Sequence, residues 1–306
     1  MSESSSFEND PISNEFNDHI PWSYSRSLKI KFNKILYSKK DTSPYLSGDS
    51  FANLSDYIVY GIKRNEKLNL TKLRDANSIF VPGNLLIKFL DEGFGDVHAK
   101  VLITGNSDQN FPKRLPLPKS INHWYCQNNA VLNSRMIKTL PIGLENSRLG
   151  RFKPSGFNQE NFIDVIMDQV LVPPMSMTNT IRIFAVKEAL KFPKVFQVEL
   201  KMINEKDYSN LTNKYRFILC CEGNGYDSHR VWETLYRGSF PVLLNSKWAQ
   251  SLKYLNLPIL IIDSFEEVTQ KILTKFANKH IDFEPVKTDC LWTPFWKELI
   301  DHRKNH

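Results

Sequence analysis

The sequence predicts an α/β fold with parallel sheets, built as two halves that face each other across a cleft. Short runs of apolar and β-branched residues alternate with helix-like segments, which is typical of parallel sheets. The polar stretch "GRFKPSGFNQENF", residues 150–162, combines Gly and Pro and indicates a domain boundary. A chain of 306 residues, 41% hydrophobic and 24% charged, is long enough for two ordinary domains.

The individual elements follow from the same alternation. Residues 1–20 are rich in Ser, Asn and acid and are expected to be disordered. The predicted strands are the short apolar runs 79–81, 101–104, 138–141, 181–184, 217–220, 241–244 and 258–262. The predicted helices span residues 83–93, 183–190, 228–237 and 265–280.

The charge of the chain favours an anionic partner. The formal net charge is +7, and the first 25 residues contain acids but no Lys or Arg, so the body is more basic still. Such a body suits nucleic acid, a nucleotide, a phosphorylated lipid carrier or an anionic membrane face. The sequence lacks zinc-finger spacing, RNP-like aromatic patterns and bZIP heptads, so we do not expect a nucleic-acid partner.

Location and metal content are also constrained. The N-terminal residues lack a signal-peptide pattern and no apolar run approaches the roughly 20 residues of a membrane helix, so a cytoplasmic protein is expected. Four cysteines do not make a disulfide framework in a chain of this size. Cys220 and Cys221 are adjacent and no His/Cys spacing of zinc type occurs, so no metal site is expected.

One stretch, "LCCEGNGYDSHRVWETLYRGSFPVLL" at residues 219–244, carries most of the functional signal. An apolar strand runs into a Gly-rich turn and then a helix, an arrangement whose free backbone N–H groups favour anions. His229 and Arg230 lie in the first helical turn, where cations oppose the helix dipole unless an anion shares the site. Glu233 follows on the same face as Arg230, where a carboxylate suits ribose hydroxyls.

A purely structural interpretation of this stretch stays open. Many Gly-rich strand-to-helix turns bind no ligand, and Asp227 or Ser228 could simply be the N-cap. Glu233 could form a weak surface ion pair with Arg230 or Arg237. A cysteine nucleophile is disfavoured, because Cys221 lacks an orienting third group beside His229.

The residues resemble a known family. "EGNGYDSHRVWETLYRGSFPVLL" is similar to the donor-site motif of exostosin-like glycosyltransferases of GT-B fold. "NTIRIFAVKEAL" resembles the family's Thr-Asn-x-x-Arg element, here Thr178, Asn179 and Arg182. "LITGNSD", "HWYCQNNA" and "LPIGLEN" resemble acceptor-domain elements of related bacterial enzymes. The resemblance covers roughly residues 79–296, is strongest at 222–244, and departs widely from animal exostosins.

The resemblance implies two Rossmann-like domains facing across a cleft: an acceptor-side domain at 21–165 and a nucleotide-sugar domain at 166–290. The C-terminal helix at 291–306 would cross back to the first domain. The implied reaction moves a sugar from a nucleoside diphosphate sugar, expected to be a UDP-sugar, to a hydroxyl of a glycan or glycolipid. It would serve polysaccharide or lipopolysaccharide synthesis, with inversion and without a cofactor, because helix dipole and cations neutralise the diphosphate.

Site residues follow from the same resemblance. The implied donor-binding residues are Thr178, Asn179, Arg182, Glu222, Gly223, Asn224, Gly225, Asp227, Ser228, His229, Arg230 and Glu233. Acceptor-side amides, which both donate and accept hydrogen bonds, are Asn106, Asn128 and Asn146.

The general base is expected in the first domain. Asp108, in the turn "TGNSD" after a predicted strand, is the first choice, although it could instead form an Asx turn or cap a helix. His123, in a predicted turn, and Glu145, at a strand end, are rivals; His123 could equally be a packed core histidine.

Two other classes of function remain open. A nucleotide-sugar epimerase or a sugar phosphorylase of the same architecture would bind a similar ligand. A nucleotide-binding module without catalysis is the non-enzymatic alternative. The basic body also allows peripheral contact with the anionic inner face of a membrane.

Overall fold

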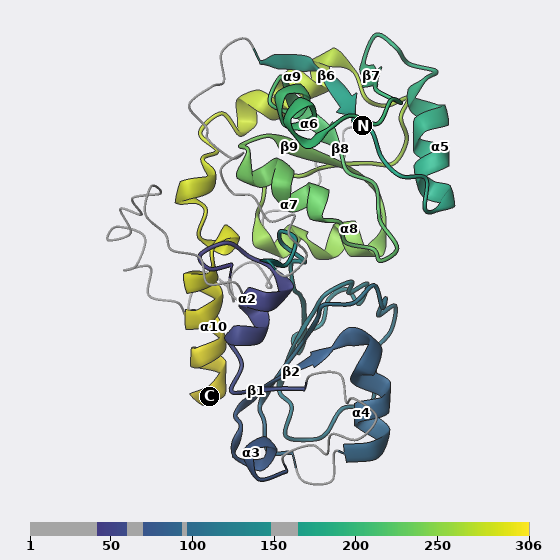
Figure 1. The fold of residues 1–306 in the computed structure, drawn as a ribbon. Coiled ribbons are helices and arrows are strands. Elements are labelled where there is room, and N and C mark those ends of the chain that lie inside the picture. Colours follow the sequence, from purple (N-terminus) through teal and green to yellow (C-terminus); the bar gives the residue numbers. More distant parts are fainter. Residues whose placement is uncertain (1–41, 60–69, 94–96, 148–164, 306) are drawn as a thin grey trace, which may run out of the picture.

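The computed structural model describes residues 42–59, 70–93, 97–147 and 165–305, which form two parallel five-stranded sheets (Figure 1). The strands of the first sheet, in spatial order, are β1 (Tyr57–Ile58), β2 (Ser78–Pro82), β3 (Val101–Gly105), β4 (His123–Cys126) and β5 (Ile137–Thr139). The strands of the second sheet, in spatial order, are β10 (Leu260–Ile262), β9 (Phe240–Leu244), β8 (Tyr215–Leu219), β6 (Ile166–Val172) and β7 (Phe196–Val198). The predicted α/β class with parallel sheets is confirmed.

The first sheet is covered on both faces. Ile79 and Leu102 pack on one side with Leu86 and Phe89 of α4, whereas alternate residues such as Phe80 pack on the other. Burial on both faces explains why these strands are almost continuously apolar. The helices between residues 48 and 93, which accompany the first sheet, are α2 (Gly48–Asn53), α3 (Leu70–Asp75), η3 (Gly83–Leu85) and α4 (Leu86–Gly93).

The second sheet is likewise sandwiched between helices. Ala185 of α5 and Leu273 of α9 pack with Phe217 on one face, whereas Trp232 of α7 and Trp248 of α8 pack with Ile218 on the other. The helices are α5 (Thr180–Ala189), α6 (Glu205–Thr212), α7 (His229–Tyr236), α8 (Lys247–Ser251) and α9 (Gln270–Lys279). The short 3₁₀ segments are η8 (Lys253–Leu255), η9 (Pro285–Lys287) and η10 (Asp289–Leu291).

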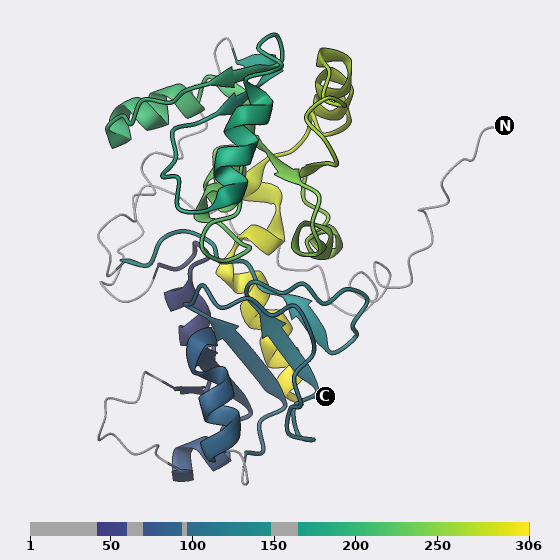
Figure 2. The ribbon, with the colours of Figure 1, turned by 90° about the vertical axis from the view of Figure 1, so that its right-hand side faces the viewer.

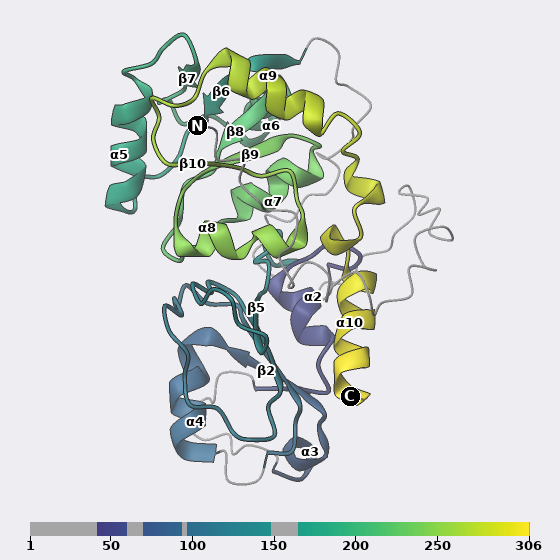
Figure 3. The ribbon, with the colours of Figure 1, turned by 180° about the vertical axis from the view of Figure 1, so that it is seen from behind.

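The chain then returns to the first sheet through α10 (Thr293–Asn305), which runs beside α2 (Figures 1 and 3). Trp296 is fully buried, with its ring centroid 5.4 Å from that of Phe51 and 6.0 Å from that of Tyr125. At the start of α10, Thr293 N donates to Pro44 O at 2.9 Å. The last helix therefore packs on the half of the molecule formed by the early residues.

The structure corrects two local predictions. Residues 181–184, predicted as a strand, belong to α5, because Asn179 caps that helix and Ala185 and Val186 bury its inner side. His123, predicted in a turn, begins β4, where Trp124 is fully buried. Strands β1, β4, β6 and β7 were not predicted as strands.

The predicted strands at 79–81, 101–104, 138–141, 217–220, 241–244 and 258–262 are confirmed, with ends shifted by one or two residues. The helix predicted at 265–280 begins later, where Thr269 caps α9. The predicted disordered N-terminus and the whole predicted boundary at 150–162 lie outside the described residues. Within the described ranges, no helix is long and apolar enough to cross a membrane.

Candidate functional site

The order of the second sheet marks where a ligand would bind. The strand order β7-β6-β8-β9-β10 reverses direction between β6 and β8, whereas the described strands of the first sheet run in sequence. At such a reversal the helices that follow the two strands lie on opposite faces, which opens a crevice at the carboxyl ends. Here α5 follows β6 and α7 packs on the opposite face. The loops 173–179 and 220–228, which follow β6 and β8, would border a crevice at this point.

The predicted Thr-Asn-x-x-Arg element ties these two loops together. Asn179 Nδ2 donates to Gly223 O, and Arg182 Nε donates to Glu222 O at 2.9 Å. Arg182 Nη1 also donates to Ser176 O at 2.9 Å and to Thr178 Oγ1 at 3.2 Å. Five predicted donor-site residues therefore meet at the strand-order reversal, and Arg182 and Asn179 fix the path of the Gly-rich turn.

Two guanidinium groups share this region without a carboxylate partner. Among the described residues, neither Arg182 nor Arg230 takes part in an ion pair. Arg230 Nε donates to Tyr208 Oη at 3.0 Å and its Nη2 donates to Pro174 O at 3.2 Å. Burial, and then the positive charge of Arg230, lower the pKa of Arg182. An anion at the crevice would compensate both cations.

The start of α7 differs from that of its neighbours. Ser228 occupies the N-cap position but makes no side-chain cap hydrogen bond, whereas Asn179 caps α5, Asn204 caps α6 and Ser246 caps α8. The positive end of the α7 dipole points into the turn that follows β8. Ser228 N donates to Asp227 Oδ1 and Val231 N donates to Ser228 O, so in the described structure the N–H groups of His229 and Arg230 are those that could bind an anionic group.

Asp227 joins the two sheets instead of lining the crevice. Its buried carboxylate accepts from Ile142 N at 2.8 Å, Ser228 N at 2.7 Å and Trp232 Nε1 at 2.9 Å, and its own N donates to Asn128 Oδ1 at 2.7 Å. Burial raises the pKa of Asp227 to about 7, although these N–H donors lower it. The carboxylate is thus fully engaged within the protein.

His229 makes a second connection between the halves. Its Nδ1 lies 2.8 Å from Gly143 O, and because a carbonyl only accepts, Nδ1 is the donor of this hydrogen bond. Gly143 has φ +69°, and a Cβ there would lie 2.2 Å from Leu46 O, so only glycine fits. His229 therefore holds the α7 start against the loop after β5.

The loop after β3 reaches the Gly-rich turn. Asn224 Nδ2 donates to Asp108 Oδ2 at 3.2 Å, and Tyr226 N donates to Asn110 Oδ1 at 2.9 Å. Asp108 is exposed, and its carboxylate accepts this hydrogen bond from the turn. The structure therefore places the predicted general base directly opposite the predicted donor loop.

The predicted acceptor-side amides are engaged in holding backbone. Asn146 Nδ2 donates to Asn106 Oδ1 at 2.8 Å, and Asn146 Oδ1 accepts from Asp49 N at 2.9 Å. Asn128 Nδ2 donates to Ser107 O at 3.0 Å. Asn106 and Asn128 adopt positive φ, which asparagine tolerates better than most residues. These contacts account for the three side chains without a ligand.

His123 does not belong to the site. It is the first residue of β4, so it lies at the amino end of that strand, whereas the Gly-rich turn meets loops at the carboxyl ends. Burial lowers the pKa of His123 to about 4, with the cations Arg303, His302 and Lys138 adding to the effect. The rival general base is therefore corrected to a partly buried neutral histidine beside α10. Glu145 follows the β5 loop and is partly buried.

Glu233 and the two adjacent cysteines are the remaining residues that the sequence analysis discussed for this stretch. Glu233 Oε2 lies 4.0 Å from Arg237 Nη1, and its side chain is 31% exposed, so it stays accessible on α7. Burial raises the pKa of Cys220 to about 12 and that of Cys221 to about 11. Both thiols are buried and protonated near neutrality, which agrees with the prediction that neither is a nucleophile.

Sequence reasoning missed two residues of the site. Tyr208 of α6 accepts a hydrogen bond from Arg230 and so orients it. Asn110 Oδ1 accepts a hydrogen bond from Tyr226 N, which lies 116 residues later in the chain. Asn110 was detectable as one more amide after the "GNSD" turn. No sequence pattern indicated Tyr208, because its contact with Arg230 forms only when the folded chain brings α6 against α7.

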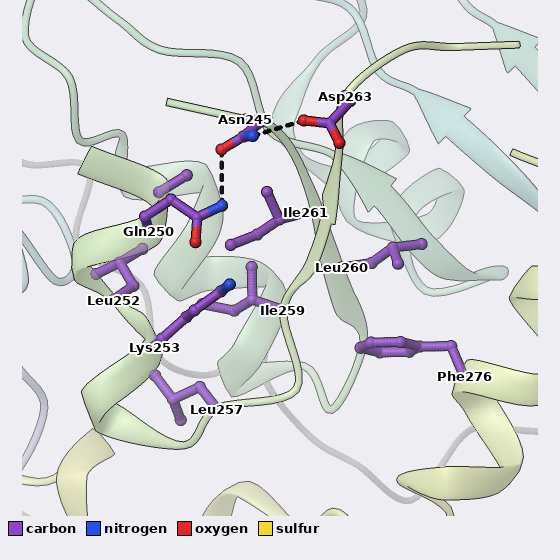
Figure 4. Close-up of a pocket in the computed structure, with 11 residues that line it drawn as sticks. Asn245, Gln250, Leu252, Lys253, Leu257, Ile259, Leu260, Ile261, Asp263 and Phe276 are labelled. Atoms are coloured by element: carbon purple, nitrogen blue, oxygen red, sulfur yellow. Dashed lines mark hydrogen bonds between the residues drawn. The ribbon is translucent and has the colours of Figure 1, made fainter. Parts of the chain in front are cut away.

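A pocket of about 380 Å³ lies elsewhere, at the β10 edge of the second sheet (Figure 4). Its walls combine aliphatic side chains such as Ile259 and Ile261 with polar ones such as Gln250 and Lys253. At its rim Gln250 Nε2 donates to Asn245 Oδ1 at 2.7 Å, and Asn245 Nδ2 donates to Asp263 Oδ1 at 2.5 Å. These polar groups are bonded to each other, and β9 and β10 separate the pocket from β8.

No family model matches the chain, and no curated protein matches it. Among the described residues, no group of three or more His, Cys, Asp or Glu side chains could hold a metal ion.

Proposed function

We propose that the protein is a glycosyltransferase of GT-B type, with the donor nucleotide held by the second sheet and the acceptor by the first. The observation that carries the proposal is that two guanidinium groups, which among the described residues have no carboxylate partner, lie with the start of α7 at the β6/β8 reversal of strand order. Such a site suits a diphosphate, since backbone N–H groups, a helix dipole and arginines all favour anionic oxygens.

The rest of the crevice is consistent with a nucleoside diphosphate sugar. Glu233, one turn along α7 from Arg230, is accessible to ribose hydroxyls. Asp108 faces the Gly-rich turn from the other sheet and is exposed. In the proposed reaction the oxygen of the acceptor hydroxyl bonds to the anomeric carbon of the donor sugar, and Asp108 accepts the proton of that hydroxyl. The bond between that carbon and the phosphate oxygen breaks, and the nucleoside diphosphate leaves.

The electrostatic part of this reaction falls to the second sheet. Negative charge develops on the departing diphosphate, so fixed cations and a helix start stabilise the transition state more than the ground state. Arg230 is held by Tyr208 and Pro174 and needs no reorganisation as charge develops. The acceptor is a hydroxyl of a glycan or glycolipid, and the proposed place of action is the cytoplasm, at the inner face of a membrane.

Ligand binding tests the donor site first. We expect UDP, GDP or CDP, each screened by thermal shift, to raise the melting temperature, since a ligand at one hundred times its Kd adds about 2.7 kcal/mol of stability. Uridine, which lacks the diphosphate, is the matched ligand control. Arg230→Ala should abolish the shift, Glu233→Gln should weaken it, and Arg74→Ala on α3 should leave it unchanged.

Turnover tests the chemistry. With labelled nucleotide sugars, Asp108→Asn should reduce transfer to an acceptor by at least about 100-fold while nucleotide binding persists. Conversion of the donor without any acceptor would instead indicate an epimerase. Binding that survives in every variant, or no response to any nucleotide, would refute the donor-site assignment.

A further inference from the structure

Helix α5 exposes large apolar side chains on the side away from the core, although the Phe184 ring also makes an edge contact with Phe265, with 6.3 Å between the ring centroids. Ala185, Val186 and Ala189 face the second sheet, as a covering helix requires. On the opposite side, however, Ile183 is 41% exposed and Phe184 is 51% exposed. Leu190, which ends the helix, is 53% exposed. A helix that covers a sheet normally presents polar residues on this outer side, so the apolar stripe needs another explanation.

Lysines are interleaved with these apolar residues. Lys187 lies one turn after Ile183, and Lys191 lies one turn after Lys187, and both are exposed. The nearest acid on this side, Glu188, pairs with Lys191 at 2.6 Å. Lys194 follows in the next loop and is also exposed. The outer side of α5 therefore combines apolar bulk with a net positive charge.

The surface continues beyond the helix. Met177, three residues before α5, is 46% exposed, and Leu200 and Met202, after β7, are 59% and 66% exposed. Because β6 and β7 are parallel neighbours, the loops that follow them lie at one edge of the sheet. Lys201 lies between the two apolar side chains. The loops after β6 and β7 thus expose apolar and basic residues at the edge of the sheet where α5 begins.

This part of the surface is placed where it could meet a large flat partner. In Figures 1 and 3 α5 forms the outer flank of the second half, and in Figure 2 it faces the viewer. The same helix carries Arg182, which braces the Gly-rich turn at the proposed donor site. A partner bound along α5 would therefore lie beside the crevice.

We propose that the outer side of α5, with Met177, Ile183, Phe184, Lys187, Leu190 and Lys191, docks on an anionic lipid bilayer. Apolar side chains enter the boundary between headgroups and acyl chains, and lysines bind the anionic headgroups while their stems remain in apolar surroundings. Charge complementarity selects this partner over a neutral apolar one. The proposal deepens the peripheral location included in the proposed function, but vesicle binding needs neither donor nor acceptor, so the two can fail separately.

Vesicle sedimentation with the full chain tests the proposal. We expect binding to vesicles of phosphatidylcholine with about one third phosphatidylglycerol, and little binding to phosphatidylcholine alone. Lys187→Gln with Lys191→Gln should weaken binding by about fivefold per lysine. Ile183→Ser with Phe184→Ser should weaken it by about tenfold or more, since buried apolar area is lost. Raising the salt concentration should reduce binding of the wild type.

Helix α4 of the first half supplies matched controls. Ile87 is 55% exposed and Lys88 is exposed, so Ile87→Ser and Lys88→Gln make the same chemical changes on another surface and should leave vesicle binding unchanged. Circular dichroism and melting temperature verify folding of every variant. Equal loss in the α4 and α5 variants, or no vesicle binding by the wild type, would overturn the proposal. The proposal would also be overturned if the wild type is a dimer and the double substitution Ile183→Ser with Phe184→Ser dissociates it. The exposed apolar side chains of α5 would then form a subunit interface.

Discussion

At the residue scale, the Asp227 carboxylate connects the two sheets by a hydrogen bond between a loop of the second and a loop of the first. It precedes α7 and was predicted among the donor-site residues, yet it accepts from Ile142 N in the loop after β5. Its separation from that donor is 85 residues, which no local pattern reveals. The sequence could identify the turn, since its glycines and helix start are contiguous, but not which of its polar side chains face the other half of the chain.

Asp227 should make stability depend on pH. An aspartate titrates near 3.9 when unfolded, whereas burial raises the pKa of Asp227 to about 7. Between these values the folded protein binds more protons than the unfolded chain, so this stabilisation is full below about pH 4 and is lost as pH rises toward 7. In Asp227→Asn this dependence should vanish, so urea unfolding should show the free-energy difference between wild type and variant shrinking from pH 5 to pH 8.

The same variant also reports on the hydrogen bonds. An amide offers one acceptor oxygen in place of two, so at least one N–H of Ile142, Ser228 or Trp232 loses its partner. The expected cost at pH 5 is about 1–3 kcal/mol. A wild-type-to-variant difference that stays constant or grows with pH would contradict the assignment of the titration to Asp227.

At the scale of elements, burial decided what the sequence could predict. Strands β2, β3, β8 and β9 are short apolar runs buried on both faces, so their pattern is unambiguous. Strand β6 begins with partly exposed and polar residues such as Asp168, which hides it. The start of helix α5 was wrongly predicted as a strand. Its outer side carries Ile183 and Phe184, and these complete a short apolar run of the kind that is typical of strands. Tertiary surroundings override local propensity in both cases.

The Gly-rich turn provides a matched pair of substitutions. A Cβ at Gly225 would lie 2.6 Å from Asn128 Nδ2, and Asn128 is buried and bonded to Asp227 N, so it cannot move cheaply. At Gly223 the nearest atom is 3.5 Å away, which is an ordinary contact. Gly225→Ala should therefore lower the unfolding free energy by about 1–3 kcal/mol. Gly223→Ala should change it by less than about 0.5 kcal/mol.

Chemical denaturation distinguishes the two glycines. If the turn approaches the first sheet as described, Gly225→Ala should also weaken nucleoside diphosphate binding, because it displaces the loop that follows β8. Equal effects of the two substitutions would show that Asn128 does not restrict this turn.

At the scale of the whole molecule, the two sheets share one core. A single apolar cluster contains Phe80 and Tyr125 of the first sheet together with Ile218 of the second, and α10 contributes Trp296 to it. Polar contacts reinforce this junction: Thr139 Oγ1 donates to Ser251 Oγ at 2.6 Å, linking β5 to α8. The sequence could predict two α/β halves from their alternation, but not a shared core, because its members are far apart along the chain.

A shared core should make unfolding cooperative across both sheets, and Trp296 is the residue to test. It is fully buried, packs on Phe51 and Tyr125, and donates from Nε1 to Cys290 O at 2.9 Å. Trp296→Ala should lower stability by about 3–5 kcal/mol, and Trp296→Phe by less, since the ring then fills part of the space. Hydrogen exchange should show the most protected amides of β3 and β8 losing protection by the same free energy, because one unfolding event exposes both. A loss confined to β3 and β4 would mean that the halves unfold independently and that α10 stabilises the first sheet alone.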